Sequence, residues 1–250
     1  NNFAGELAGT AGGTYTNVHA TGNVTGIETV GGLIGYSNGV TLNTAYASGN
    51  VTGAGQDVGG LLGMSNYGTL TNVSASGTVT NTGSYTGGLV GRTDGTTISN
   101  ASFSGTVSGA FGTGGIAGFN GGTITDAQVT GTVTGTAAVG GIAGLNLGGT
   151  LSNVLFAGSV TGILTVGGVA GASTGTIDHA TSTGTVSGTS NVGGIAGNNL
   201  GGITNSSVTG AVTGTENTGG LVGNNIGAGE VSNSTWNTTS TGQAGGVGNG

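Results

Sequence analysis

The sequence predicts an all-β protein, a parallel β-helix (β-solenoid) that runs as a single repeat array over residues 1–250. Three observations predict it: a glycine-containing unit recurs every 26–28 residues, apolar residues stand at fixed offsets within that unit, and apolar and polar residues alternate over short stretches. A fixed period in this range is typical of a solenoid. Alternation with period two indicates strands, and no stretch of ten or more residues has the 3.6-residue period of a helix.

The repeat is easiest to follow from the stretch Gly114-Gly115-Ile116-Ala117-Gly118. Equivalent stretches begin at Gly5, Gly31, Gly59, Gly87, Gly114, Gly140, Gly167, Gly193 and Gly219, and a degenerate one begins at Gly245. These repeats fill the chain and leave no room for a separate domain. We therefore expect about nine coils, and we expect the array to be a segment of a longer protein.

Each repeat contains three apolar columns, which predict three short strands per coil. The columns are Leu7, Leu33, Leu61, Leu89, Ile116, Ile142, Val169, Ile195 and Leu221; Tyr15, Leu42, Leu70, Ile98, Ile124, Leu151, Ile177, Ile203 and Val231; and Val24, Val51, Val79, Val107, Val133, Val160, Val186 and Val212. Each strand should pair in parallel with its equivalent in the next coil, about 4.8 Å away. We expect right-handed winding, by analogy with crossover connections between parallel strands.

A polar column follows the second apolar column two residues later. It comprises the asparagines Asn17, Asn72, Asn100, Asn153, Asn205 and Asn233, interrupted by Thr44, Asp126 and His179. Strict alternation predicts that these side chains point inward, as a structural asparagine ladder at a bend. Stacked amides can hydrogen-bond one another because each has donors and acceptors.

Hydroxyl side chains flank the stacked valines and should point outward. The candidate ligand face consists of Thr25, Thr52, Thr78, Thr80, Thr106, Ser108, Thr132, Thr134, Thr161, Thr185, Ser187 and Thr213. Regular Thr-x-Thr files on a flat sheet resemble the ice-binding faces of β-helical antifreeze proteins. The alternative is that threonine stands here because it suits an exposed strand.

Composition excludes several classes of function. The chain has one Lys or Arg residue, eight acidic residues and a net charge of −7, so it has no basic patch for nucleic acid or for an anionic membrane surface. No apolar run approaches about 18 residues, so we expect no membrane insertion. The chain has no cysteine, which excludes disulfides and thiolate metal sites.

We expect no enzyme activity, no metal and no cofactor. The acidic residues are spread at about one per coil and at different offsets, whereas catalysis needs converging groups. His19 and His179 lie too many coils apart to share a metal. Aromatic residues such as Tyr36, Tyr85 and Phe119 do not share one column, so the sequence shows no stripe for stacking sugars.

The repeat at 139–162, VGGIAGLNLGGTLSNVLFAGSVTG, resembles the GLUG-motif repeat. The Gly-Leu-small-Gly core of that repeat stands here as Gly32-Leu33-Ile34-Gly35 and as Gly88-Leu89-Val90-Gly91. The middle coils depart mildly, with alanine for the larger apolar residue. The resemblance implies a large secreted bacterial surface protein, such as an adhesin of the filamentous-haemagglutinin type or an autotransporter passenger, and it supplies no catalytic residues.

These observations leave two functions open. The first is a structural or adhesive rod at the bacterial cell surface or in the extracellular space. Its partners would be other cell-surface molecules, carbohydrate or further copies of itself, through end-to-end or lateral assembly. The second is an ice-binding module that uses the outward threonines.

Overall fold

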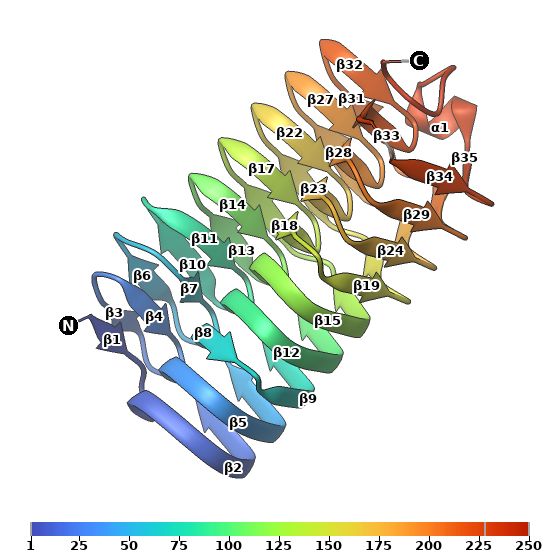
Figure 1. Ribbon diagram of the computed structural model, residues 1–250. Coiled ribbons are helices and arrows are strands. Elements are labelled where there is room, and N and C mark those ends of the chain that lie inside the picture. The colour runs from blue at the N-terminus through green and yellow to red at the C-terminus, as the bar shows by residue number, and fades with distance from the viewer. Residues whose placement is uncertain (1, 228, 250) are drawn as a thin grey trace.

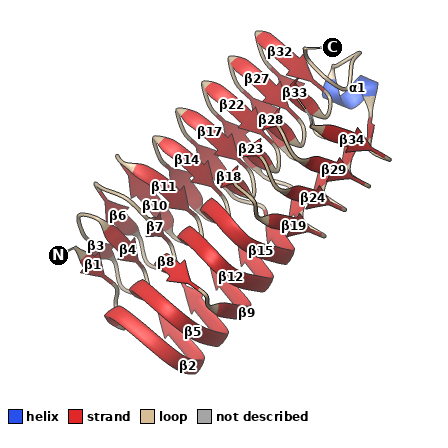
Figure 2. Ribbon diagram, viewed as in Figure 1, coloured by secondary structure: helices blue, strands red, loops and turns tan. Residues whose placement is uncertain are grey.

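The computed structural model describes residues 2–227 and 229–249. The chain winds into stacked coils that form an elongated rod, with its two termini at opposite ends (Figure 1). Strands pair in parallel with their equivalents one coil away, and helix is confined to one short segment near the C-terminus (Figure 2). The predicted all-β parallel solenoid of about nine coils is confirmed.

Two of the three sheets are built from one short strand per coil. The nine strands of the first sheet are β1 (Phe3–Ala4), β4 (Thr29–Gly31), β7 (Val58–Gly59), β11 (Ser84–Gly87), β14 (Phe111–Gly114), β17 (Ala137–Gly140), β22 (Leu164–Gly167), β27 (Ser190–Gly193) and β32 (Glu216–Gly219). The eight strands of the third sheet are β3 (Val24–Thr25), β6 (Val51–Gly53), β10 (Thr78–Asn81), β13 (Thr106–Ser108), β16 (Thr132–Thr134), β21 (Ser159–Thr161), β26 (Thr185–Ser187) and β31 (Val212–Thr213).

The second sheet is bent, and it differs between the two halves of the rod. Long strands span the bends in four coils: β2 (Ala8–Ala20), β5 (Ile34–Ala47), β12 (Val90–Phe103) and β15 (Ala117–Val129). One coil has two pieces, β8 (Leu62–Asn66) and β9 (Thr69–Ala75). The last four have three pieces each: β18 (Ala143–Asn146), β19 (Thr150–Ser152) and β20 (Leu155–Phe156); β23 (Ala170–Ser173), β24 (Thr176–Asp178) and β25 (Thr181–Ser182); β28 (Ala196–Asn199), β29 (Gly202–Thr204) and β30 (Ser207–Val208); β33 (Val222–Asn225), β34 (Glu230–Ser232) and β35 (Thr235–Trp236).

The core is a set of stacked columns inside the coil. Leu61, Leu70 and Val79, one from each predicted column, are all fully buried. The first coil departs from the prediction, because Leu7 is 46% exposed and Tyr15 is only half-buried. No described residue packs on the outer side of that coil. Each buried large side chain contributes about 1.5–3 kcal/mol, so stability depends on the stacking of neighbouring coils.

The predicted asparagine ladder lies on the outside of the rod, which corrects the expectation that it points inward. Asn100 and its equivalents are exposed, and each has a positive φ, 50° at Asn100 itself. A left-handed residue breaks the alternation of the strand, so Ser99 and Asn100 both face outward before Ala101 turns in. Asparagine tolerates this conformation better than most residues, and Asn100 Nδ2 also donates to Asn72 Oδ1. We call this exposed file the bend ladder; its members are Asn17, Thr44, Asn72, Asn100, Asp126, Asn153, His179, Asn205 and Asn233.

A different polar column faces the interior, and the sequence analysis missed it. This inward ladder consists of Ser37, Ser65, Thr93, Asn120, Asn146, Ser173, Asn199 and Asn225. Asn120 Nδ2 donates to Asn146 Oδ1 at 2.8 Å, and Asn146 Nδ2 donates to Ser173 Oγ at 3.1 Å. The same amides also bond turn carbonyls, as Asn146 Nδ2 does with Gly149 O at 3.2 Å. The ladder therefore holds the turn of each coil against the next.

The C-terminal end of the rod is covered by the chain itself. After β35 comes the short helix α1 (Thr238–Thr241), whose N-cap is Asn237. Gln243 Nε2 donates to Val212 O at 2.9 Å, which satisfies a carbonyl on the outer edge of the third sheet. Asn249 accepts from the backbone N–H of Asn225 and donates to its carbonyl, on the edge of the second sheet. Among the described residues no helix is long and apolar enough to cross a bilayer.

Candidate functional site

The candidate site is the outer surface of the third sheet, and its strands follow from the pentapeptide Gly-Thr-Val-Thr-Gly. In β16, Val133 is fully buried while Thr132 and Thr134 are exposed. Gly131 precedes the strand where two coils approach closely, because a Cβ there would lie 2.3 Å from the carbonyl oxygen of Gly105. Glycine at this turn lets the coils stack, and the alternating strand then presents hydroxyls to solvent.

The structure places the twelve candidate residues in two parallel files. Thr132 stands opposite Thr106 in one neighbouring coil and opposite Ser159 in the other. Thr134 lies likewise between Ser108 and Thr161. We call this surface the hydroxyl face; it comprises Thr25, Thr52, Thr78, Thr80, Thr106, Ser108, Thr132, Thr134, Thr161, Thr185, Ser187 and Thr213. Thr80 is partly exposed and the other eleven are exposed.

The hydroxyl face is regular along most of the rod and changes at its ends. Among the described residues, one hydrogen bond between hydroxyls is found on this surface, from Ser159 Oγ to Thr132 Oγ1 at 3.3 Å. Towards the N-terminus asparagine replaces threonine, and Asn50 Oδ1 accepts from the backbone N–H of Thr78. The hydroxyls therefore form a lattice of donors, acceptors and methyl groups that repeats about every 4.8 Å along the rod.

The bend ladder contains a small charged cluster. Asp178 accepts hydrogen bonds from Thr204 Oγ1 at 2.6 Å and from Asn205 Nδ2 at 2.9 Å, and its other oxygen lies 2.7 Å from His179 Nδ1. These bonds, with Thr204 contributing most, lower the pKa of Asp178 to about 2. The cluster is open to solvent, so it stabilises the surface of a bend.

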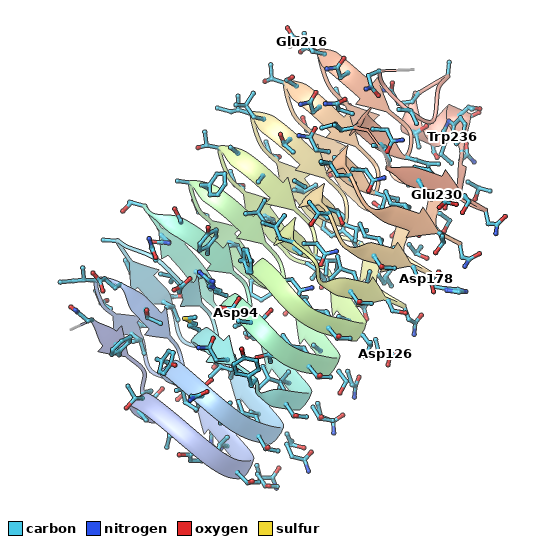
Figure 3. All side chains as sticks on the ribbon, viewed as in Figure 1. Asp94, Asp126, Asp178, Glu216, Glu230 and Trp236 are labelled. Atoms are coloured by element: carbon cyan, nitrogen blue, oxygen red, sulfur yellow. The ribbon has the colours of Figure 1, made fainter. Side chains whose placement is uncertain are left out.

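Of the remaining described carboxylates, Asp57 and Asp94 both lie near Arg92, and they form no larger acidic cluster. Figure 3 shows Asp94, Asp126, Asp178, Glu216 and Glu230 at separate places along the rod. Within residues 2–227 and 229–249 no three His, Cys, Asp or Glu side chains form a group that could hold a metal ion. His19 and His179 lie in different coils, and His19 instead stacks on Tyr46 with the ring centroids 5.1 Å apart.

Aromatic rings from different columns meet in the N-terminal half of the rod, where the sequence analysis expected no stacking surface. Tyr85 contacts Phe111, with centroids 6.1 Å apart, and Phe119, with centroids 5.5 Å apart. The guanidinium of Arg92 lies over the Phe119 ring at 4.8 Å and is ion-paired with Asp94 at 2.8 Å. Because these residues come from two sheets, no single repeat offset could reveal the cluster.

One coil of the rod identifies the repeat. It carries the Gly88-Leu89-Val90-Gly91 core and strands β11, β12 and β13, the last of which lies in the hydroxyl face. Residues 82–108 match the family model described as the GLUG motif. This chain carries the GLUG motif. The coils on either side pair with the matched GLUG coil residue by residue, as Val79 and Val133 do with Val107. No curated protein and no solved structure matches the chain.

Proposed function

We propose that the chain is a non-catalytic rod of a bacterial cell-surface or secreted protein, and that it mediates attachment or presents attachment surfaces. The observation that carries the proposal is the parallel, coil-by-coil pairing of the strands along the whole described rod, with register shifts only where β2 meets β5 and β12 meets β15, which gives a stiff body with repeated outer faces. A solenoid of this kind offers an extended binding surface, because every coil adds the same positions to each face.

The distribution of charged side chains supports a binding role and argues against a catalytic one. No three acidic or histidine side chains of the described coils form a cluster, and the single Arg92 is already paired with Asp94. Polar groups on the outer faces are mostly neutral hydroxyls and amides. Such a surface suits ligands that are recognised by many weak contacts, including carbohydrate, other surface molecules or further copies of the rod.

Surface display tests this proposal. Cells that display the rod should adhere to a host-cell layer or to one another more than cells that display only the carrier. A matched control displays the rod with one complete coil removed, since it keeps the faces and should retain most of the adhesion. Equal adhesion with and without the rod, at equal display, would contradict the proposal.

We propose ice binding as the second candidate, and the register of the hydroxyl face is the observation that favours it. Two files of hydroxyls and methyls at a constant spacing can order water in a lattice, which scattered threonines cannot do. The expected result is measurable thermal hysteresis that is lost in Thr132→Tyr and in Thr185→Tyr. Thr174→Tyr is the matched control, because Thr174 is exposed and its equivalents in the neighbouring coils are Leu147 and Leu200. Absence of hysteresis at millimolar protein would eliminate this candidate.

A further inference from the structure

One side of the rod departs from the repeat over several consecutive coils. At one outward position of the second sheet, the successive coils carry Tyr36, Met64, Arg92 and Phe119 in direct register. Leu145 follows Phe119 at the same position, and Ala172 and Asn198 stand there further along the rod. Large side chains therefore occupy five consecutive coils of this side, and aromatic rings or arginine occur there only from Tyr36 to Phe119.

Two adjacent strands of the first sheet, β11 and β14, each add one more ring to the same place. Tyr85 and Phe111 pack against each other and beside Phe119, and Phe111 remains 43% exposed. Phe3 packs on Tyr36, with ring centroids 5.6 Å apart. We call this surface the aromatic face; its members are Phe3, Tyr36, Met64, Tyr85, Arg92, Phe111 and Phe119.

The Arg92–Asp94 pair gives the aromatic face directional hydrogen-bonding capacity, and the pair itself carries no net charge. Arg92 Nε and Nη2 donate to Asp94, whose carboxylate neutralises the guanidinium, and the Arg92 side chain is 32% exposed. The arginine plane lies on the Phe119 ring, a geometry that fixes the guanidinium. Arginine and aromatic rings are also the side chains most enriched where proteins bind partners.

The dimensions and chemistry of the aromatic face fit one kind of ligand. Rings stack on the apolar faces of sugars, while a neutral Arg–Asp pair bonds hydroxyl groups. Coils repeat about every 4.8 Å, a spacing close to the length of one pyranose residue in an extended β-linked chain. The chain's net charge of −7 disfavours acidic polymers.

We propose that the aromatic face binds a neutral, extended polysaccharide that runs along the rod axis, one sugar residue per coil. This proposal names a ligand for the attachment role proposed above. Its biological meaning rests on that role, but the binding itself does not. Binding in solution needs no surface display. A rod that adheres but binds no sugar would therefore remove this proposal alone.

The test uses the whole chain and oligosaccharides of defined length. The probes are β-linked neutral oligosaccharides of two to six residues, titrated calorimetrically, with uronic-acid oligosaccharides of equal length for comparison. We expect affinity for at least one neutral series to rise from the disaccharide to the tetrasaccharide and to change little with salt. Lack of binding at millimolar ligand, or binding of the acidic series alone, would overturn the proposal.

Each substitution introduces a residue that another coil already carries at the equivalent position, so the fold should tolerate the substitutions. The triple variant Tyr85→Asn, Phe111→Ser and Phe119→Leu should weaken binding at least tenfold. The double variant Arg92→Met and Asp94→Asn, which copies the preceding coil, should do the same.

Leu164→Ser is the matched control, because it removes an exposed apolar side chain from the column of Phe111 outside the aromatic face. It should leave affinity unchanged. Full binding by the triple variant would overturn the proposal. The proposal would also be overturned if the wild-type protein were a dimer and the triple variant a monomer, because the aromatic face would then be an interface between two copies of the chain.

Discussion

At the scale of single residues, Asp57 is unusual because it is a carboxylate inside a chain with few charges. It is 5% exposed, and its Oδ1 has no hydrogen-bond partner among the described residues. Burial raises its pKa from 3.8 to about 6, although the positive charge of Arg92 partly opposes this effect. The folded chain therefore retains this proton up to about pH 6, whereas the unfolded chain releases it near pH 4.

Asp57→Asn should remove that pH dependence. Between pH 4 and pH 6 the folded state binds more protons than the unfolded state, so the contribution of Asp57 to stability falls as pH rises. At pH 7 the variant should be more stable by up to about 3 kcal/mol, since each pKa unit corresponds to about 1.4 kcal/mol. Asparagine suits the backbone there, because Asn191 and Asn217 occupy equivalent left-handed positions.

Urea unfolding at pH 3.5 and pH 7 measures the effect, with the exposed Asp126→Asn as control. The two proteins should be equally stable at pH 3.5. A difference between wild type and Asp57→Asn that stays constant over this range would contradict the assignment.

Asn100 shows how one backbone conformation sets the shape of a coil. Its left-handed φ bends the second sheet. Alanine in this conformation is destabilised by a steric clash of about 1–2 kcal/mol. Asn100→Ala should lower the free energy of unfolding by about that amount, and Asn100→Gly by less. Chemical denaturation measures both, with Ser102→Ala on the same strand as the neutral control. Equal effects at the two positions would show that the left-handed turn carries no special cost.

At the scale of elements, the inward ladder joins the turns of successive coils. Asn146 donates to Ser173 and accepts from Asn120, so Asn146→Ala removes both bonds and leaves one buried N–H of the Asn120 amide without its partner. We expect a loss of about 1–3 kcal/mol. Asn146→Ser should cost less, because serine fills the same position in other coils, as Ser65 does. Thermal unfolding distinguishes the two variants, and an identical loss in both would mean that only volume matters at this position.

The sequence predicted strands and sheets better than it predicted which way polar side chains point. Columns such as Val107 over Val133 could be assigned because stacking requires the same offset in every coil. The bend ladder was assigned to the wrong side because a single left-handed residue reverses the alternation, and period alone does not report φ. The inward ladder was readable as a fixed offset of six residues after each repeat start, from Ser37 onwards. The aromatic face was readable only in part, because Tyr36, Met64, Arg92 and Phe119 share an offset of five residues after the repeat start, whereas Phe3, Tyr85 and Phe111 join them from the first sheet.

At the scale of the whole molecule, one coil is the unit of structure. Deleting residues 132–158 joins Gly131 to Ser159 and should leave a folded rod, because Thr132 and Ser159 are equivalent positions. The dependence of unfolding free energy on urea should fall by about one ninth, in proportion to the surface exposed on unfolding.

A deletion of half a coil, residues 132–144, is the control for this experiment. It leaves one coil with half its length, so the coils before and after the junction cannot stack in register and the rod should no longer unfold as one cooperative unit. If both shortened chains unfolded alike, the coil would not be the repeating unit of stability.

The two ends of the rod differ in how their sheet edges are satisfied. At the C-terminal end Gln243 and Asn249 supply hydrogen bonds in place of a further coil, and Trp236 covers the last layer. Figure 3 shows Trp236 beside the final turn. At the other end Phe3 and Leu7 remain exposed. Strand addition by another chain is therefore disfavoured at the C-terminal edge.

The in-register stacking has a consequence for how such a chain can lengthen. Every paired strand joins residues only one coil apart, so the entropy lost in closing each loop is the same at any position and at any total length. A tandem duplication of one unit would bring its own full set of contacts without making any existing one harder to form. Selection could then change the length of the rod in steps of one coil, while the folding barrier for each coil stays constant.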